Sequence, residues 1–556
     1  MPAARSQIAL KLLPSMTDFA FLMPIVFLFA RMNGLQTLFN DCDTGWHIRT
    51  GEWILANYRV PTHDIFSFSK PGGTWYAWEW LSDVIWAWLR AHGGLAALSL
   101  FAILIISFTY VLLFGLVRRH ANAIVAVLLT MTAAVASSVH WLARPHLFTL
   151  LFLVLFYRAL ERVREGQANW RGIPYLAMLP AATILWTNLH GGFFVGIVMI
   201  GAYGAGELLK ALFTAVREER RPALHHAAAY IFTSLACLAA SLVNPYTWRL
   251  HVHVIEYLLD PYQAQHIMEF LSVSFHHPLA VFFEGMLLLA TLAAFWYASR
   301  GEYIQPVLLL MWAHAALLSV RNIPIFMIVA APPAAAALQT WLDRLPEFHM
   351  AEWLRRAARN FNRVAADMTA TDSLARSHAV SVAAILVVAG LVYAPHPPGG
   401  FRAEFSAKTF PVAAAARLAA DPSARIFTTD QWGDYLIYSL YPQTRVFTDG
   451  RSDYYGAEFG QKYLDVLNVS LGWDKTLARF GVDTILMPPG SPLTGALKES
   501  PRWRAVYDDG VAVIFRPAGK PLGKLSVASR GGLSRDREIT KTKASDLGIA
   551  IHKTKT

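Results

Sequence analysis

Long uncharged apolar runs dominate the first 394 residues of the chain. Residues 94–117 carry no charged side chain, and a helix needs about 20 apolar residues to cross roughly 30 Å of hydrocarbon. Ten further runs are similarly apolar, some with one or two charged residues, at 17–39, 121–143, 146–160, 173–189, 192–214, 227–243, 279–298, 303–319, 323–341 and 378–394. The pattern predicts a mainly α-helical polytopic membrane domain over residues 1–394, with about eleven transmembrane helices.

The charges predict the direction of these spans. Arg5 and Lys11 precede the first run, which lacks a small-residue cleavage site, so we expect a retained anchor with a cytoplasmic N-terminus. Threading from this start places the arginine-rich segments 158–171, 210–221 and 344–376 on the cytoplasmic side, as the positive-inside rule requires. The orientation of the spans in the membrane then explains the net charge of +11, and nucleic acid is not an expected partner.

The same threading places the other connections on the outer face. These are a first loop at 40–93, a longer loop at 244–278 and everything after residue 394. From residue 395 short β-rich runs such as "VDTILMPP" alternate with helical stretches, which predicts a small extracytoplasmic α/β domain over 395–518. Residues 519–556, which are rich in Lys, Arg, Ser and Thr, are predicted to be a disordered basic tail.

The composition excludes several classes of protein. With 55% hydrophobic and only 16% charged residues, the chain is too apolar for an ordinary soluble enzyme. Its two cysteines, Cys42 and Cys237, lie far apart and indicate neither a disulfide framework nor a zinc site. No nucleotide-binding fingerprint is present, neither a glycine-rich turn after a strand nor a P-loop.

The first outer loop offers the clearest candidate chemistry. Asp41 and Asp43 stand two residues apart in "NDCDTGWHI", directly after the first span. Such a pair can take up a proton or share a divalent cation such as Mg or Mn. The alternative is that these acidic residues cap the next helix, because "DTGWHIRTGEWIL" is typical of a helix start.

Further polar residues of this loop are candidates for an acceptor site or pocket. They are His47, His63, Asp64 and Glu79. Glu79 is charged within an apolar helix and should therefore face protein or a polar pocket. The surrounding tryptophans, Trp75, Trp78, Trp80, Trp86 and Trp88, are interpreted as anchors at the membrane interface.

Basic and amide side chains recur at the outer ends of other spans. Cations there run against the positive-inside bias, so each needs a partner such as a carboxylate, a lipid headgroup or a bound anion. Candidates to bind a donor phosphate are Arg144, His146, His190, Arg249 and Arg321, with Asn188 as a further pocket residue. Local salt bridges or lipid contacts are the alternative for each of them.

These groups suit one kind of reaction. No ATP is available outside the cell, so a synthetic enzyme there needs a substrate that carries its own activated group across the membrane. Lipid-linked sugar phosphates do this. Transfer from them requires a carboxylate to deprotonate the acceptor and cations to bind the departing phosphate.

At these motifs the chain resembles the GT-C superfamily of multi-spanning glycosyltransferases. The matching residues are Asp41 and Asp43 in "DCDTGWHI", followed by Glu79 and Trp80. "PTHDIFSF", "EWLSDV" and "WGDYLIYSLYPQTRVFTDGRSDYY" are similar to a bacterial group with this architecture. The resemblance implies a polyprenyl-phosphate sugar donor and a glycan, lipid or protein acceptor at the outer face of the bacterial inner membrane. It also implies hexosyl or pentosyl transfer, with Asp43 or Asp41 as base or metal ligand.

Two alternative functions, and one assignment in the C-terminal domain, remain open at this stage. A transporter or lipid flippase would use polar groups within the spans, for which Glu207, Glu284 and His314 are candidates. A ligase or polymerase of the O-antigen type would use the basic loop at 244–278, with Arg249, His251, His253, His266, His276 and His277. In the C-terminal domain Asp449 and Arg451 either bind an acceptor or belong to a plain Asp-Gly turn.

Overall fold

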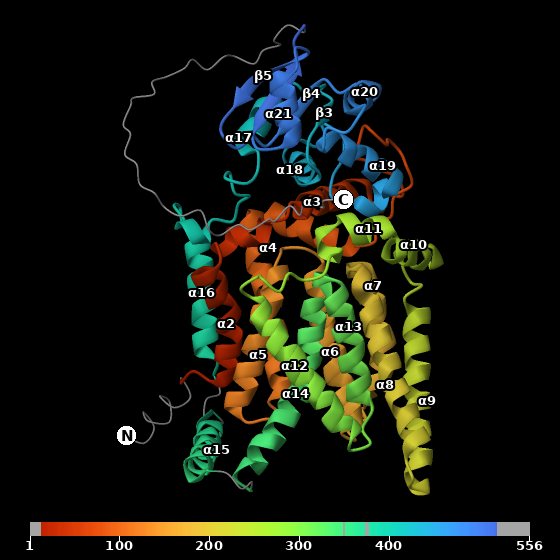
Figure 1. Ribbon diagram of the computed structural model, residues 1–556, viewed down its shortest axis with the longest axis vertical. Coiled ribbons are helices and arrows are strands. Elements are labelled where there is room, and N and C mark those ends of the chain that lie inside the picture. Colours follow the sequence, from red (N-terminus) through yellow and green to blue (C-terminus); the bar gives the residue numbers. More distant parts are fainter. Residues whose placement is uncertain (1–12, 348–350, 373–376, 520–556) are drawn as a thin grey trace. The chain divides into compact units, whose positions relative to one another are not determined.

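The computed structural model describes residues 13–347, 351–372 and 377–519, which belong to one compact unit (Figure 1). Arg5 and Lys11, and the tail predicted at 519–556 apart from Gly519, lie outside the described residues. The domain boundary at residue 394 stays a prediction.

Every apolar run of the sequence coincides with a helix. These helices are α2 (Met16–Arg31), α4 (Trp80–Val117), α5 (Ala123–Ser137), α6 (His146–Arg164), α7 (Tyr175–Leu189), α8 (Phe194–Phe213), α9 (Arg217–Ala240), α12 (Ala280–Ala298), α13 (Ile304–Leu318), α14 (Ile323–Arg344) and α16 (Ala379–Val392). Within the described ranges six helical stretches are long and apolar enough to cross a membrane, while α7, α13 and α16 are shorter apolar helices. The prediction of a mainly α-helical polytopic membrane protein is thereby confirmed.

Helix α4 extends further toward the N-terminus than its apolar run. It begins at Trp80 and bends at Gly93 and Gly94, where Gly94 has a φ of 65°. Because this left-handed conformation favours glycine, the two glycines mark the bend between a tryptophan-rich first part, which carries Asp83 and Arg90, and the uncharged part at 95–117. The first loop, defined from here on as residues 40–79, is therefore shorter than the predicted 40–93.

Helix α3 (Asp43–Asn57) lies inside the first loop. It begins at Asp43, as expected, and Asp41 Oδ1 accepts a hydrogen bond of 2.9 Å from the Asp43 backbone N–H at this start. Two glycines allow close packing. A Cβ on Gly51 would lie 1.9 Å from the carbonyl oxygen of Asp83 in α4, and one on Gly45 would lie 2.8 Å from that of Asp434. Helix α3 is thus in close contact both with α4 and with the C-terminal residues.

The C-terminal α/β region, residues 395–519, contains a four-stranded sheet in the order β3-β4-β6-β5. Strand β3 (Ile426–Phe427) is parallel to β4 (Thr484–Met487), while β6 (Val513–Pro517) is antiparallel to β4 and to β5 (Trp503–Asp508). The helices of this region are α17 (Val412–Leu418), α18 (Asp430–Leu440), α19 (Ser452–Leu467), α20 (Trp473–Arg479) and α21 (Pro492–Glu499). The α/β character is confirmed.

One expected strand of this region is reduced to bridges. The run "TRVFTDG" forms only isolated parallel bridges, from Val446 to Ile426 and to Ser67 of the first loop. The first loop therefore extends the sheet, and its backbone N–H at Phe68 donates to the carbonyl of Val446.

The remaining elements connect the helices. They are α10 (Trp248–Leu259), α11 (Pro261–His266), α15 (Glu352–Asp372), the short strands β1 (Asn169–Trp170) and β2 (Ile173–Pro174), and the 3₁₀ helices η1 (Gly34–Phe39), η2 (Ser138–His140), η3 (Gly191–Phe193), η4 (Met268–Phe270), η5 (Val320–Asn322), η6 (Leu345–Glu347) and η7 (Gly399–Phe401).

The interpretation of the first-loop tryptophans as interface anchors is wrong for two of them. Trp75 and Trp86 are buried in the core, and Trp86 Nε1 donates to the carbonyl of Ala143 over 2.7 Å. The indole N–H finds its partner inside the protein rather than in water. Trp88, which is 54% exposed, fits the anchor interpretation.

Candidate functional site

A cavity of about 460 Å³ lies where the first loop, the ends of several apolar helices and the C-terminal α/β region meet. One wall is apolar and comes from the helices α6, α8, α13 and α14, with Leu150, Phe194, Val195, Val198, Trp312 and Ile325. The other wall is polar, with Asp43, Glu79, Arg144, His146, His190 and Arg321. The cavity can therefore take a ligand that is apolar at one end and polar at the other.

The polar side chains come from helix ends, where the chain leaves the apolar helices. Asp43 is the first residue of α3, and Glu79 directly precedes α4. His190 follows the last residue of α7, and Arg321 lies in η5 between α13 and α14. Side chains from helices distant in sequence thus line one cavity.

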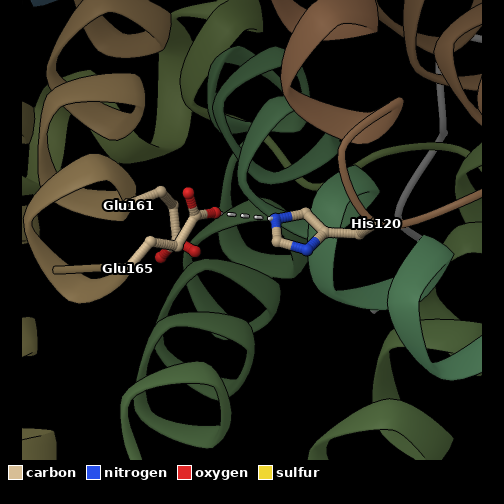
Figure 2. Close-up of side chains that lie close together, drawn as sticks. All are labelled: His120, Glu161 and Glu165. Carbon is tan, nitrogen blue, oxygen red and sulfur yellow. Dashed lines mark ion pairs between the residues drawn. The ribbon is translucent and has the colours of Figure 1, made fainter. Parts of the chain in front are cut away.

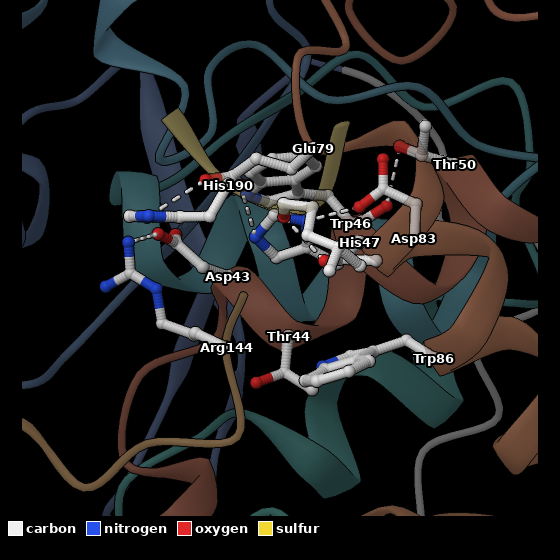
Figure 3. A network of polar contacts seen from close by, with 12 residues as sticks. Asp43, Thr44, Trp46, His47, Thr50, Glu79, Asp83, Trp86, Arg144 and His190 are labelled. Atoms are coloured by element: carbon white, nitrogen blue, oxygen red, sulfur yellow. Dashed lines mark hydrogen bonds and ion pairs between the residues drawn. The ribbon is translucent and has the colours of Figure 1, made fainter. Parts of the chain in front are cut away.

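Arg144 is the centre of an ion-pair cluster. Its Nη1 donates to Asp41 Oδ2 over 2.6 Å and to Glu269 Oε1 over 2.7 Å. Its Nη2 donates to Asp43 Oδ2 over 2.7 Å (Figure 3). The three carboxylates outweigh the effect of burial and raise the pKa of Arg144 well above its usual value. Conversely, although burial favours its neutral form, the pKa of Glu269 is lowered, chiefly by Arg144.

Asp43 is 7% exposed and uses only one oxygen in the pair with Arg144. Its Oδ1 faces Asp434 Oδ2, and neither atom has another partner. Burial raises the pKa of Asp43 to about 8, and the positive charge of Arg144 only partly opposes this effect. Burial and the charge of Asp43 likewise raise the pKa of Asp434.

Glu79 sits between two histidines (Figure 3). Its Oε1 lies 3.2 Å from His190 Nε2, and its Oε2 lies 3.4 Å from His47 Nε2. His47 Nδ1 is in turn 2.6 Å from Asp83 Oδ1. Burial raises the pKa of Glu79 to about 8 and lowers that of His190 to about 3. Both groups are therefore neutral over much of the physiological range.

The backbone fixes the tautomer of His190. The N–H of Gly192 donates to His190 Nδ1 over 3.0 Å, so this nitrogen carries no proton. In the neutral ring Nε2 must then carry the proton, and this N–H donates a hydrogen bond to Glu79 Oε1. Thr149 Oγ1, which accepts from Trp186 Nε1 over 2.9 Å, can donate to Nδ1 over 2.7 Å.

Five further polar atoms of the cavity wall are buried without a hydrogen-bond partner. They are Trp46 Nε1, His146 Nδ1, Trp312 Nε1, Arg321 Nη1 and Arg451 Nη1. Unpaired buried polar atoms cost free energy, and all five belong to residues that line the cavity. His146 Nε2 lies 2.7 Å from the carbonyl of His140 and donates to it, which leaves Nδ1 as an acceptor.

Six of the predicted site residues do not line this cavity: Asp41 and His47 contact the lining residues Arg144 and Glu79 from outside it, and four others lie elsewhere. Arg249 is exposed on α10, and His63 is exposed in the first loop. Asn188 lines a separate apolar groove, where it accepts a hydrogen bond from Trp80 and donates hydrogen bonds to the carbonyls of Ile184 and Val243. Asp64 is fully enclosed and pairs with Arg451 over 2.8 Å. Sequence position at a helix end does not tell which way a side chain points, and these four point elsewhere.

Arg451 belongs to the packing between the first loop and the C-terminal α/β region. It pairs with Asp64 and Asp449 and lies 4.5 Å from the ring centre of Trp75. Only its Nη1 remains unpaired at the cavity wall. Asp449 is thus occupied by Arg451 and does not itself line the cavity.

The sequence analysis missed several residues of the site. They are Glu269, Asp434, Gly450 and Asp453. A weak signal existed for Glu269, because it is the acidic residue in the short stretch "HIMEF". No pattern in the sequence predicts that Asp434 belongs to the site, because its position beside Asp43 depends on the contact of α18 with α3.

A second cluster of possible metal ligands lies at the other end of α6. His120, Glu161 and Glu165 bring their ligand atoms within 4.8 Å of one another (Figure 2). Their oxygens already have partners, because Glu161 accepts from Arg164 and Tyr203 and Glu165 pairs with Arg119. We therefore interpret this cluster as part of a structural ion-pair network.

No protein-family model and no curated protein sequence matches the chain. Its fold is similar to that of a solved archaeal oligosaccharyltransferase. The archaeal oligosaccharyltransferase AglB from Archaeoglobus fulgidus, solved in complex with an inhibitory peptide and a dolichol-phosphate, is similar with a TM-score of 0.51 and 13% identity. The match covers 85% of this chain and 69% of that chain.

A second structure of the Archaeoglobus fulgidus oligosaccharyltransferase, in complex with zinc and sulfate, matches with a TM-score of 0.49. Its identity is 13%, and the match covers 85% of this chain and 68% of that chain.

Proposed function

We propose that the chain is a membrane glycosyltransferase that moves a sugar from a polyprenyl-phosphate donor to an acceptor of the cell envelope. One observation carries this proposal. A single cavity joins an apolar wall from the membrane helices to a buried carboxylate and several cations. A lipid-linked sugar phosphate has the same order of groups, namely an apolar chain, an anionic phosphate and a polar sugar.

The donor phosphate is proposed to lie beside Arg321. This arginine lines the cavity close to the apolar wall, and its Nη1 is buried without a hydrogen-bond partner. A phosphate oxygen there would gain a charge-assisted hydrogen bond. As the bond from the anomeric carbon to the phosphate oxygen breaks, the oxygen keeps the electron pair and Arg321 stabilises the negative charge.

Asp43 is proposed to act as the base. The acceptor hydroxyl attacks the anomeric carbon, and its proton passes to Asp43 Oδ1, the oxygen that Arg144 leaves free. A pKa of about 8 lies close to the pH at which such an enzyme works, which is favourable for general base catalysis. Asp41, which is bonded to the helix start and to Arg144, is proposed to position Asp43.

The sugar is proposed to bind between these groups. Trp46 Nε1 and Trp312 Nε1 are free donors at the cavity wall, and His146 Nδ1 is a free acceptor. Glu79, held by His47 and His190, is available for one further hydrogen bond to a hydroxyl. The alternation of donors and acceptors suits the hydroxyl groups of a carbohydrate.

We further propose that the reaction takes place at the outer face of the bacterial inner membrane, with the N-terminus in the cytoplasm. The support is the distribution of arginines along the sequence, which favours the cytoplasmic side for the ends opposite to the cavity. The acceptor is proposed to be a glycan, a lipid or a protein.

The two other functions receive less support. Glu207, Glu284 and His314, the candidates for a transport path, do not line the cavity. In the loop at 244–278 the exposed residues include Arg249, His266, His276 and His277, whereas the cavity is lined by Tyr257 and Glu269. The loop thus contributes an acidic group rather than the basic set that a ligase would need.

The direct test is a transfer assay with purified protein and the polyprenyl lipids extracted from the host membrane. Mass spectrometry follows the release of free polyprenyl phosphate. We expect release by the wild type and by Glu458→Gln, an exposed carboxylate of the C-terminal α/β region, but not by Asp43→Asn. Equal release by the wild type and Asp43→Asn would contradict the role of Asp43, and absence of release from all three proteins would contradict the proposed reaction.

A further inference from the structure

The acidic residues around Asp43 form the kind of centre that usually holds a divalent cation. Asp41, Asp43 and Glu269 each direct one carboxylate oxygen to a common point. Oxygen ligands of this kind are the ones that Mg²⁺ and Mn²⁺ prefer. The point at which they converge is, however, the guanidinium of Arg144.

The distances leave little room for a metal ion at that point. The three oxygens lie 2.6 to 2.7 Å from the Nη atoms of Arg144, which are ordinary lengths for charge-assisted hydrogen bonds. A Mg²⁺ ion needs several oxygens at about 2.0–2.1 Å around one centre. The same oxygens could reach such an ion only if Arg144 moved away.

The second oxygens of the two aspartates are enclosed by protein, although only that of Asp41 has a hydrogen-bond partner. Asp41 Oδ1 accepts from the backbone N–H of Asp43, and Asp43 Oδ1 faces Asp434 Oδ2. A Cβ on Gly450 would lie only 2.3 Å from Asp43 Oδ1, so the backbone of Gly450 approaches this oxygen closely. The first-loop pair therefore does not offer a free bidentate face.

The backbone beside Arg144 is held firmly. The N–H of Ala143 donates to the carbonyl of Leu38 over 2.8 Å. The carbonyl of Ala143 accepts from Thr44 Oγ1 over 3.0 Å and from Trp86 Nε1 over 2.7 Å. These three contacts fix the backbone from which the side chain of Arg144 starts, and its three ion pairs hold the guanidinium among the carboxylates.

We infer that Arg144 is the resident cation of this acidic centre, and that it takes the place in which a divalent metal ion would otherwise bind. The expected Mg or Mn site at Asp41 and Asp43 is then filled by a side chain of the protein itself. Only the consequence for catalysis, that Arg144 holds the base and adds positive charge near the phosphate, rests on the proposed function.

The decisive experiment measures metal binding and needs no substrate. Titration of the purified full-length protein with Mn²⁺, followed by electron paramagnetic resonance, counts the ions bound per chain. The variants are Arg144→Gln, which removes the cation but keeps a similar length, and Arg249→Gln, which removes an exposed arginine outside the cavity. We expect the wild type and Arg249→Gln to bind no stoichiometric Mn²⁺, and Arg144→Gln to gain one site that Asp43→Asn removes.

Two results would overturn the inference. One is stoichiometric Mn²⁺ binding by the wild type that is lost in Asp43→Asn. The other is a folded Arg144→Gln protein that gains no site, because the carboxylates would then not define a cation position. If Arg144→Gln does not fold, Arg144→Lys keeps a positive charge, and we expect it to fold and to bind no Mn²⁺.

A transfer assay distinguishes failure of this inference from failure of the proposed function. If transfer by the wild type is unchanged by a chelator, both stand. If no transfer is found while Mn²⁺ binding follows the expected pattern, the proposed reaction fails and the assignment of Arg144 remains.

Discussion

Asp43 of the first loop and Asp434 of helix α18 face each other across Gly450. A Cβ on Gly450 would lie 2.3 Å from Asp43 Oδ1 and 2.7 Å from Asp434 Oδ2. The proposed base is therefore completed by residues of the C-terminal α/β region, nearly four hundred positions later in the chain. Absence of a side chain at residue 450 is what leaves space for the two carboxyl groups.

Gly450→Ala is expected to lower the rate of transfer by about 100-fold without unfolding the protein. The added methyl group must displace Asp43 Oδ1, and a displacement of about 1 Å at a reacting group can lower the rate by about 100-fold. The comparison is Gly490→Ala, because no atom lies within 4 Å of a Cβ at that position. Transfer rates of both variants are measured with the donor in excess. Full activity of Gly450→Ala would show that Asp43 Oδ1 takes no part.

Asp43→Asn is expected to lower the rate of transfer by about 10²- to 10⁴-fold, the usual contribution of a general base. The amide keeps the shape of the side chain and can still accept from Arg144. The KM for the donor should change little, because Asp43 is assigned to the acceptor. A fall in donor affinity with an unchanged maximal rate would assign Asp43 to the donor instead.

Arg321→Ala is expected to raise the KM for the donor by about 10- to 100-fold, because one charge-assisted hydrogen bond to the phosphate is lost. Arg249→Ala removes an arginine that the sequence also suggested but that is exposed on α10. It should leave the KM unchanged. A raised KM in Arg249→Ala with an unchanged KM in Arg321→Ala would instead place the phosphate site at the loop at 244–278.

Glu79→Gln tests the buried carboxyl group through the pH dependence of stability. In the folded protein the pKa of Glu79 is raised from 4.5 to about 8. The folded state therefore holds a proton that the unfolded chain has lost between these values. The stability that it contributes is present below pH 4.5 and is lost as the pH rises through 8.

Glutamine stays neutral at every pH, so the variant should not lose this stability. We expect the difference in Tm between Glu79→Gln and the wild type to become more positive as the pH rises from 4.5 to 8. Thermal unfolding in the same detergent at several pH values measures it, with Glu458→Gln as the exposed control. A difference that does not depend on pH would mean that Glu79 is ionised in the folded state.

Arg451→Ala is expected to destabilise the protein by about 3–5 kcal/mol, because it leaves two enclosed carboxylates, Asp64 and Asp449, without their partner. Arg502→Ala breaks an exposed ion pair with Asp474 and should cost no more than about 1 kcal/mol. Denaturation curves of the two variants provide the comparison. Equal stability of both would mean that the buried pairs contribute no more than a surface pair.

The sequence could predict the helices because membrane spans obey a simple rule. Each apolar run is long enough to form one helix, and nothing but a helix satisfies its backbone in hydrocarbon. The start of α3 at Asp43 and the presence of Arg144, His146, His190 and Arg321 in one cavity also follow from sequence, because helix ends on one side share a level.

The partners of these residues could not be predicted in the same way. Asp434 and Glu269 reach Asp43 and Arg144 only through the packing of α18 and of the loop at 244–278. Such contacts depend on tertiary structure and leave no periodic signal. For the same reason His63 and Asn188, which were also candidates from the sequence, do not line the cavity.

The lipid that co-purifies with the protein tests the central claim most directly. An enzyme that lacks its base should retain a donor that the active enzyme consumes. Mass spectrometry of lipids extracted from the wild type and from Asp43→Asn should therefore find a polyprenyl-phosphate sugar enriched on the variant, and its mass would give the class of sugar. The same phospholipids on both proteins, with no polyprenyl-linked sugar on either, would contradict the account.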